Sequence, residues 1–417
     1  MQIKQENDGH AVIDQLTGEE VLTCAINIGE QLLMSGAEIS RVEDTIRRIC
    51  AAYDIRQSHI FSIASCIIVT LETKDHKWIT QTRRILSYGT DMWKLDRLNN
   101  LSRLICSTKP PLERINREYA LILNGPVYPP VVQCLIYAMT AGAFAIFFGG
   151  NLLDGFSAMF VGALIRITLY AFTAIKMKPI FSNILCSMIS GMVCILTHYI
   201  GLGHHVEMIM IGNIMLLIPG VLMTNSFRDF ISGDMISGLL HFSEAIITAI
   251  CIAAGFIFSK NTAWRYLMNQ ELISVISAFF GSLGFSIIYN IRGLRIWIPA
   301  IGGAVFWAVY LIFLHFINNE FLGFFFVAIL ITIYSEIWAR ILKTPSTVIL
   351  MPTVIPLIPG GSLYYAMDAA LRHDMPQFFL KAQAAVGLAV ALAAGIMAVT
   401  SMQHLISALI KMIKPAP

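Results

Sequence analysis

Residues between 213 and 244 carry polar side chains inside a segment that is otherwise apolar. Pro219-Gly220 is followed closely by the run Thr224-Asn225-Ser226-Phe227-Arg228-Asp229, and Asn213 precedes it by about two helical turns. A helix broken at this point exposes amides that can hold a carboxylate, and carbonyls or an acidic side chain that can hold an ammonium group. These residue types therefore suit a small zwitterion such as an amino acid.

Charged side chains near the break are candidates for moving or gating a proton. The pKa of a carboxyl group rises in an apolar wall, so such a group can carry a proton through a transport cycle. Glu244 is the strongest candidate because it lies well inside an apolar stretch. The full set of candidates for proton coupling or gating is Arg228, Asp229, Asp234, Glu244, Glu336 and Asp368.

Structural roles compete with a transport role at several of these positions. Arg228 and Asp229 could pair in a cytoplasmic loop, and Asp234 could cap the helix that follows it. Glu336 and Arg340, four residues apart on one helix face, suit an intrahelical ion pair. The residue types alone leave these alternatives open.

The polar positions belong to an internal repeat. Residues 217–255 align with residues 357–395 without a gap, with 12 identities in 39 positions. Leu-Ile-Pro-Gly occurs at the start of both segments, so the break at Pro219-Gly220 has a counterpart in the second half. The candidate substrate-binding residues come from both breaks: Asn213, Pro219, Gly220, Thr224, Asn225, Ser226, Pro356, Pro359, Gly360 and Gly361.

Amino-acid composition indicates which kind of structure must position these residues. Charged residues make up 13% of the 417-residue chain, against about 25% in soluble domains. Residues 1–125 hold 15 of the 29 basic and 16 of the 26 acidic side chains, so the rest cannot maintain a water-facing surface. This pattern excludes a fully soluble enzyme, a nucleic-acid-binding protein and a disordered scaffold.

The apolar remainder contains about ten stretches that match the roughly 20 residues needed to cross a bilayer. If residues 1–125 are cytoplasmic, nine basic residues near the span ends lie inside and four outside, which predicts that both termini are cytoplasmic. The chain is thus expected in the cell membrane, and its short links also allow a homo-oligomer. The expected spans are 131–149, 155–173, 180–200, 206–223, 235–258, 272–290, 296–317, 321–339, 346–363 and 382–409.

Each half of this region has five expected spans, an odd number, so the second half enters the membrane from the opposite side. Inverted repeats with broken helices near the midplane are typical of secondary transporters. The predicted fold class is a mainly α-helical polytopic membrane protein with two five-helix inverted repeats, at 130–258 and 270–412. A small α/β cytoplasmic domain at 15–125 precedes them.

The N-terminal domain shows mixed periodicity. Gly36 is expected to end its first helix, and the Arg/Glu-rich face of its second helix is interpreted as solvated, with i,i+4 pairs. We expect a regulatory or gating role. The predicted elements are helices over 21–32, 38–53 and 95–105 and a strand hairpin formed by 60–71 and 78–82.

Motifs for other chemistries do not occur in the sequence. It has no P-loop, dinucleotide fingerprint or HExxH motif, and its eight cysteines form no CxxC pair. We therefore expect no cofactor, no metal and no catalytic residue. The polar N-terminus predicts no secretory signal peptide.

Two membrane segments resemble the threonine/serine exporter family. One is the run from Pro219-Gly220 to Glu244-Ala245, and the other extends from Ser335-Glu336 to Pro359-Gly360-Gly361. The N-terminal part adds Gly36-Ala37 and Arg41-Val42-Glu43. The resemblance covers about 17–412 and implies a ten-span carrier that exports small hydroxy amino acids, driven by the proton motive force. One departure between the halves matters, since the equivalent of Asp229 is Ala369, beside Asp368, so the halves are not functionally identical.

Several functions follow as hypotheses. The leading one is a proton-coupled exporter of threonine and serine. Split members of the same family have been linked to dicarboxylate export, which makes a succinate-type exporter the alternative, with Arg166, Arg228 or Arg340 as the anion clamp. A membrane-embedded hydrolase lacks a nucleophile–base pair, and the asymmetric halves argue against a passive channel.

Overall fold

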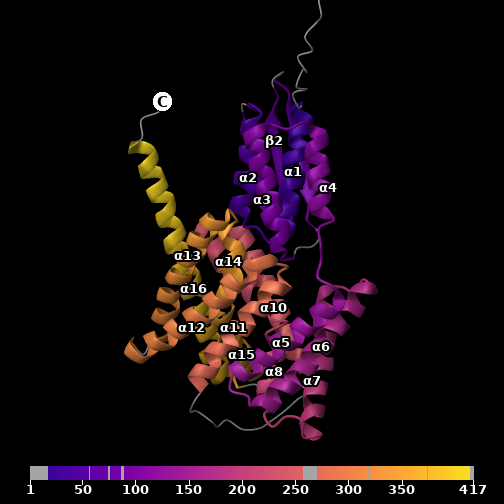
Figure 1. Cartoon of the computed structure of the whole chain (residues 1–417), viewed down its shortest axis with the longest axis vertical. Helices are drawn as coiled ribbons and strands as arrows, with labels where there is room; N and C mark the ends of the chain where they lie inside the picture. Colours follow the sequence, from indigo (N-terminus) through magenta and orange to yellow (C-terminus); the bar gives the residue numbers. More distant parts are fainter. Residues whose placement is uncertain are drawn as a thin grey trace, which may run out of the picture. The chain divides into compact units, whose positions relative to one another are not determined.

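The computed structural model describes residues 17–55, 57–73, 76–85, 89–256, 270–317, 319–372 and 374–413. The chain divides into two compact units, Met1–Pro126 and Val127–Pro417 (Figure 1). The first is a small mixed α/β unit and the second is helical throughout its described residues.

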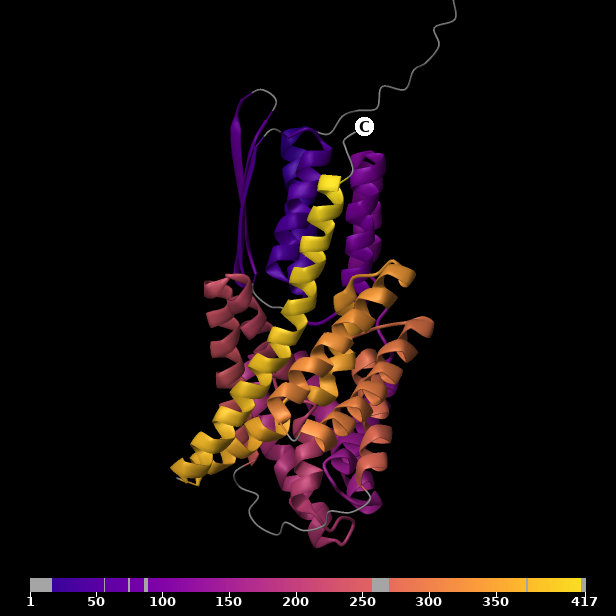
Figure 2. The same cartoon turned by 90° about the vertical axis from the view of Figure 1, so that its left-hand side faces the viewer.

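The N-terminal unit places a three-stranded antiparallel sheet, of order β1-β2-β3, against helices. Figure 2 shows the sheet with the helices on one side of it. Ile67, Val69 and Leu71 alternate along the middle strand and are fully buried, whereas Phe61 and Trp78 are about half exposed. The elements are α1 (Gly18–Met34), α2 (Ile39–Ala52), β1 (Ser58–Ile63), β2 (Cys66–Glu72), β3 (Trp78–Arg84), α3 (Met92–Thr108) and α4 (Leu112–Leu123).

Local signals explain most of these elements. Thr17 and Glu20 form a capping box at the start of α1. Gly36, with φ of +94°, follows its end as expected. The predicted hairpin is present as β2 and β3, which pair antiparallel. The prediction missed one strand, because the run 60–71 contains two strands joined by a two-residue turn at 64–65. Ala and Ser lack the Asn or Gly that usually marks such a turn, so the turn is hidden within a β-branched run.

The second unit contains two series of helices (Figure 1). The first series is α5 (Pro130–Phe147), α6 (Leu152–Ala174), α7 (Pro179–Tyr199), α8 (Val206–Ile214), α9 (Gly220–Ser232) and α10 (Met235–Phe256). The second series is α11 (Gln270–Ile288), η1 (Gly293–Ile296), α12 (Trp297–Ile317), α13 (Glu320–Leu342), α14 (Ser346–Val354), η2 (Ile355–Leu357), α15 (Gly360–Leu371) and α16 (Met375–Ile413). Figure 2 shows α16 as one long, unbroken helix.

Eight helices in the described part of the chain are long and apolar enough to cross a membrane. The pair α14–η2 and α15, bent by 52°, makes a ninth if it is one broken span. The fourth expected span, 206–223, is divided between α8 and α9. The structure therefore supports a polytopic membrane protein of eight or nine candidate spans, and the count of ten stays a prediction.

Corresponding helices in the two series make corresponding contacts. α6 packs on α5, α7 and α8, and α12 packs on α11, α13 and α14. In the same way α10 contacts α7 and α9, and α16 contacts α13 and α15. α5 and α11 pack directly on each other and join the series. Small buried residues such as Ala141, Ala145 and Ala158 allow helices to approach closely, as is usual in membranes.

Candidate functional site

The two Leu-Ile-Pro-Gly segments interrupt their helices in the same way. Pro219 is the N-cap of α9, with φ, ψ of −82° and 45°, and Pro359 is the N-cap of α15, with −74° and 49°. The identical sequence thus produces nearly the same backbone conformation in both halves. Each break leaves a helix N-terminus whose first amides have no intrahelical acceptor.

The two breaks lie against each other. A Cβ added to Gly360 would lie 2.7 Å from the sulfur of Met215, the residue that follows α8. Ile218 and Tyr364, one beside each break, pack against the same buried cluster. The backbone of the second break therefore approaches the side chains of the first, and Gly360 leaves the space for this contact.

Asn213 and Thr353 occupy equivalent positions one to two turns before the breaks. Both are fully buried. The Asn213 amide donates a hydrogen bond of 2.8 Å to the carbonyl of Ile209, and the Thr353 hydroxyl donates one of 2.7 Å to that of Ile349. The side-chain oxygen of Asn213 has no hydrogen-bond partner in the described structure. An unpaired buried acceptor costs about 1–3 kcal/mol, so this oxygen is suited to accept from a bound molecule.

The polar run after the first break lies along α9. Thr224 and Ser226 are buried and Asn225 is half-buried. The Ser226 hydroxyl donates to the carbonyl of Met223 at 2.7 Å. The equivalent residues of α15 are Tyr364, Tyr365 and Ala366, so the two helices differ in side-chain chemistry.

Asp229 lies in a charged cluster at the end of α9. Its carboxylate is 2.9 Å from the Nδ1 atom of His241 on α10, and both Asp229 and Arg228 are 7% exposed. An Arg228–Asp229 loop pair was one expectation. That pair stays a prediction, and the structure gives Asp229 a contact with a histidine twelve residues away, which sequence analysis did not single out. The signal available for it was a histidine within an apolar stretch.

Asp234 occupies the turn between α9 and α10, outside the candidate span that starts at Met235. Burial, and to a lesser degree the charge of Asp229, raise the pKa of Asp234. Its equivalent, Asp374, accepts a hydrogen bond of 3.2 Å from the amide of Gln377 and so caps α16. The two turns share their backbone bonds, since Asp234 N donates to Asp229 O and Asp374 N donates to Ala369 O.

The remaining proton-coupling candidates lie apart from this cluster. Asp368 forms an ion pair of 2.9 Å with Arg372 near the end of α15. Glu336 is half-buried on α13, and among the described ion pairs none joins it to Arg340. Glu244 is exposed on α10, on the same side as the exposed Leu240 and Ile247, rather than enclosed in the helix bundle.

Arg166 is held inside the unit by neutral groups. Its guanidinium donates to the side-chain oxygen of Gln133 at 2.7 Å from Nε, and also from Nη2. The rings of Tyr137 and Tyr170 each lie 5.8 Å from it. The amide oxygen and the two ring faces stabilise this cation, and no ion pair joins it to a carboxylate in the part of the chain that the structure describes.

One buried carboxylate was missed by sequence analysis. Asp154 is fully buried near the start of α6 and accepts hydrogen bonds from the backbone amides of His204 and His205. It also lies 2.7 Å from Nδ1 of His205. These bonds tie the loop before α8 to α6. No group of three or more metal-ligating side chains occurs among the residues that the structure describes.

The fold and the paired breaks define a class: a polytopic helical membrane protein whose halves each carry a discontinuous helix. Comparison with family models makes the assignment specific. Residues 23–262 match the model described as "Putative threonine/serine exporter", and residues 274–402 match "Threonine/Serine exporter, ThrE". The chain belongs to the threonine/serine exporter family.

Two of three individual relatives carry the name of this family. The chain is 21% identical to the "Threonine/serine exporter" of Corynebacterium glutamicum over 403 residues, which covers 90% of the chain and 81% of the relative. It is 22% identical to a "Probable threonine/serine exporter" of Mycobacterium tuberculosis (62% of the chain, 49% of the relative). It is also 21% identical to "Pheromone-regulated membrane protein 10" of Kluyveromyces lactis (81% and 37%). No solved structure matches.

These matches indicate a transporter rather than an enzyme. They give no support to the dicarboxylate or hydrolase alternatives.

Proposed function

We propose that this chain exports threonine and serine from the cytoplasm in exchange for protons, and that it binds its substrate where the two helix breaks meet. Membership of the exporter family supports the substrate class. The observation that carries the proposed site is the contact between Gly360 and Met215. The buried and unpartnered oxygen of Asn213 belongs to the same segment, two residues before Met215. The proposal places both termini in the cytoplasm and the helical unit in the cell membrane.

The chemistry of this place fits a small hydroxy amino acid. The N-termini of α9 and α15 provide amides and the positive ends of helix dipoles for the substrate carboxylate. The oxygen of Asn213 can accept a hydrogen bond from the ammonium or the hydroxyl group. A buried polar group that only a hydroxylated substrate satisfies discriminates strongly against an analogue that lacks the hydroxyl.

The proposed architecture is an inverted repeat in which the broken helices are the fourth and ninth spans. The matching Pro219 and Pro359 geometry and the matching helix contacts support it. In such transporters the substrate site lies between the repeats, and access alternates as one bundle moves against the other.

Proton coupling is proposed to involve the cluster of Asp229, His241 and Asp234, with Glu244 as a further candidate. The Asp229 and His241 side chains share a contact of 2.9 Å, so a proton can reside on either group. The asymmetry between Asp229 and Ala369 would confine this function to the first half.

Counterflow of labelled threonine in proteoliposomes tests the substrate. We expect exchange that excess unlabelled serine inhibits and excess succinate does not. Folded protein that exchanges no threonine, or exchange blocked by succinate alone, would overturn the substrate assignment.

The same vesicles test coupling. Asp229→Asn and Glu244→Gln should retain counterflow, which needs no net proton movement, and the variant that removes the coupling group should lose uptake driven by a pH gradient. Glu320→Gln is the matched control, because Glu320 is an exposed carboxylate in the first turn of α13. If both test variants respond to the gradient like wild type, neither carboxylate couples protons.

A further inference from the structure

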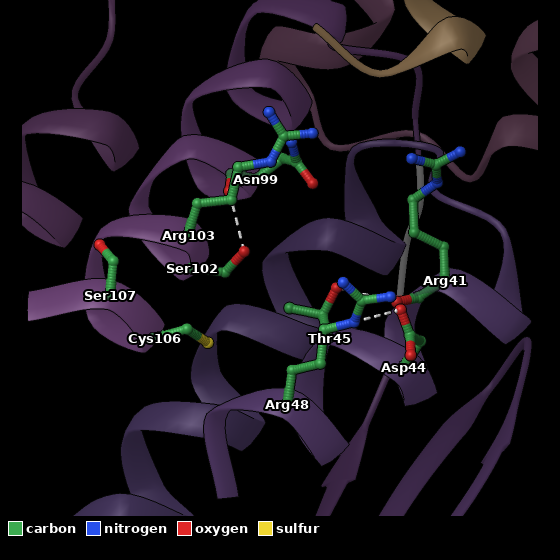
Figure 3. A pocket seen from close by; sticks show the side chains of 9 residues that line it. All are labelled: Arg41, Asp44, Thr45, Arg48, Asn99, Ser102, Arg103, Cys106 and Ser107. Atoms are coloured by element: carbon green, nitrogen blue, oxygen red, sulfur yellow. Dashed lines mark hydrogen bonds and ion pairs between the residues drawn. The ribbon is translucent and has the colours of Figure 1, made fainter. Parts of the chain in front are cut away.

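A cavity of about 430 Å³ lies between α2 and α3 of the N-terminal unit (Figure 3). Its volume is within the range of about 300–1,000 Å³ that is common for small-molecule sites. Its lining contains hydroxyls, amides, charges and one thiol, but no aliphatic or aromatic side chain. The lining residues are Arg41, Asp44, Thr45, Arg48, Asn99, Ser102, Arg103, Cys106 and Ser107.

The cavity arises from two polar stripes at helical spacing. Positions 41, 44, 45 and 48 form one side of α2, and positions 99, 102, 103 and 106 form one side of α3. The apolar stripes of the same helices, which include Ile46 and Leu98, are fully buried elsewhere in the unit. The polar side of α2 was expected to be a solvated face. The i,i+4 pair of Asp44 and Arg48 confirms part of that expectation, but this side of α2 also faces α3.

The charge of the lining is strongly unequal. Three guanidinium groups face a single carboxylate, and that carboxylate, Asp44, already accepts from Nε of Arg48 at 2.8 Å. Outside the lining, Glu38 lies 4.0 Å from Nη2 of Arg41. The lining therefore carries an excess of two positive charges. A phosphate monoester carries about 1.5–2 negative charges at pH 7, whereas an amino acid zwitterion carries no net charge.

Two donor atoms on residues that line the cavity lack acceptors. The Nε atom of Arg41 and the Nδ2 atom of Asn99 are enclosed, and neither has a hydrogen-bond partner in the described part of the chain. The two residues come from facing helices, so one ligand rich in oxygen acceptors could satisfy both. Guanidinium groups match the geometry of phosphate oxygens particularly well.

The hydroxyl groups of the lining provide acceptors, in contrast to the donors described above. Thr45 and Ser102 are each 7% exposed, and they donate their protons to the carbonyls of Arg41 and Asn99, each at 2.8 Å. Their oxygens remain able to accept. The cavity thus offers donors for a phosphoryl group and acceptors for hydroxyl groups.

We propose that the cavity between α2 and α3 binds a small phosphate monoester that carries hydroxyl groups, a ligand of the sugar-phosphate class. Arg41, Arg103 and Asn99 contact the phosphoryl oxygens, while Thr45 and Ser102 accept from the ligand hydroxyls. This binding site is separate from the proposed transport site in the helical unit, so neither proposal depends on the other.

Alkylation of Cys106 provides a local readout in the full-length protein. Cys106 lines the cavity and is half-buried. Burial raises the pKa of its thiol, and the nearby Arg48 opposes this rise, so labelling with N-ethylmaleimide is best followed at mildly alkaline pH. The label on the Cys106 peptide is quantified by mass spectrometry, and thermal unfolding of the same samples gives a second measure of binding.

We expect ribose 5-phosphate to slow Cys106 labelling severalfold and saturably, and inorganic phosphate to do so more weakly. Ribose, threonine and succinate should have no effect. Arg41→Gln combined with Arg103→Gln should raise the ribose 5-phosphate concentration that gives half-maximal protection. The expected rise is about tenfold or more for each charged hydrogen bond lost. Arg47→Gln and Arg97→Gln are matched controls, since these exposed arginines lie on the same helices outside the cavity.

Distinct results would overturn the proposal. Equal protection by succinate would show that any dianion suffices, and equal loss in the control variants would place binding elsewhere. Protein in nanodiscs containing phosphatidic acid tests a lipid source for the same phosphoryl group. Protection there, without any effect of ribose 5-phosphate, would assign the cavity to a lipid headgroup instead of a soluble ligand.

Discussion

Replacing Asn213 by leucine separates a role in substrate binding from a role in folding. The side chain is fully buried, its amide is bonded within its own helix, and its oxygen is unpartnered. Leucine has a similar shape and no polar atoms. Removing the unsatisfied acceptor should therefore leave the free energy of unfolding unchanged or raise it, by up to about 1–3 kcal/mol.

The effect of Asn213→Leu on transport should be the opposite. If the Asn213 oxygen accepts from the substrate, its loss costs about 0.5–1.5 kcal/mol for a hydroxyl donor and about 1.5–3 kcal/mol for an ammonium donor. At 1.4 kcal/mol for each factor of ten, exchange at low threonine concentration should fall about 2- to 150-fold. Threonine counterflow and thermal unfolding in detergent, on the same preparations, measure both quantities.

Thr332→Val is the matched control for this test. Thr332 is also buried and donates to a helix carbonyl at 2.7 Å, but it lies on α13, outside both breaks. Its replacement should leave exchange near the wild-type rate. An Asn213→Leu protein that is less stable than wild type and still exchanges threonine normally would refute the reasoning, because Asn213 would then be structural.

Three further predictions concern packing, thiol reactivity and capping. A Cβ at Gly212 would lie 2.6 Å from backbone atoms of α5, so Gly212→Ala should destabilise the helical unit by about 1–3 kcal/mol, measured as a lower melting temperature. Gly361→Ala meets its nearest neighbour at 3.4 Å and should melt like wild type; equal melting of both variants would contradict this packing. Burial raises the pKa of Cys24 to about 12 and of Cys50 to about 11. A raised pKa lowers the thiolate fraction at a given pH. Maleimide labelling of both thiols should therefore be very slow at pH 8 in folded protein and should become faster as the pH rises. Rapid labelling at pH 8 would argue against their burial. Thr17→Ala removes the capping box of α1 and should lower its stability by about 1 kcal/mol. This loss should appear as faster hydrogen exchange in the first turns of α1, and unchanged exchange there would show that the cap is dispensable.

Periodicity and composition predicted the membrane segments well, because long apolar runs have few alternative structures. The break at Pro219-Gly220 and its counterpart were also visible, since a repeated Pro-Gly pair interrupts any helix. The start of the first break was not visible, because α8 ends at Ile214, five residues before Pro219, within a run that has no helix-breaking residue.

The contacts between side chains could not be predicted from the sequence. The contacts of Asp229 with His241 and of Asp154 with His205 join residues 12 and 51 positions apart, and their geometry depends on how helices pack. The cavity between α2 and α3 was hidden for a similar reason. A charged helical stripe looks the same in sequence whether it faces water or a second polar stripe.

The contact between the α9–α10 and α15–α16 hairpins has a consequence for alternating access. Three of its five buried residues are alanines, Ala245, Ala249 and Ala385, and the other two, Met223 and Leu363, occupy equivalent positions in the repeat. Alanine has no rotamer to change and no branch to interlock with a neighbour. At these three positions one hairpin can shift along the other without reorganising side chains. The larger side chains packed around them, which include Phe227 and Phe242, would have to change rotamer in such a shift. If access alternates as proposed, these rings rather than the alanines would contribute to the barrier between the inward-open and outward-open forms.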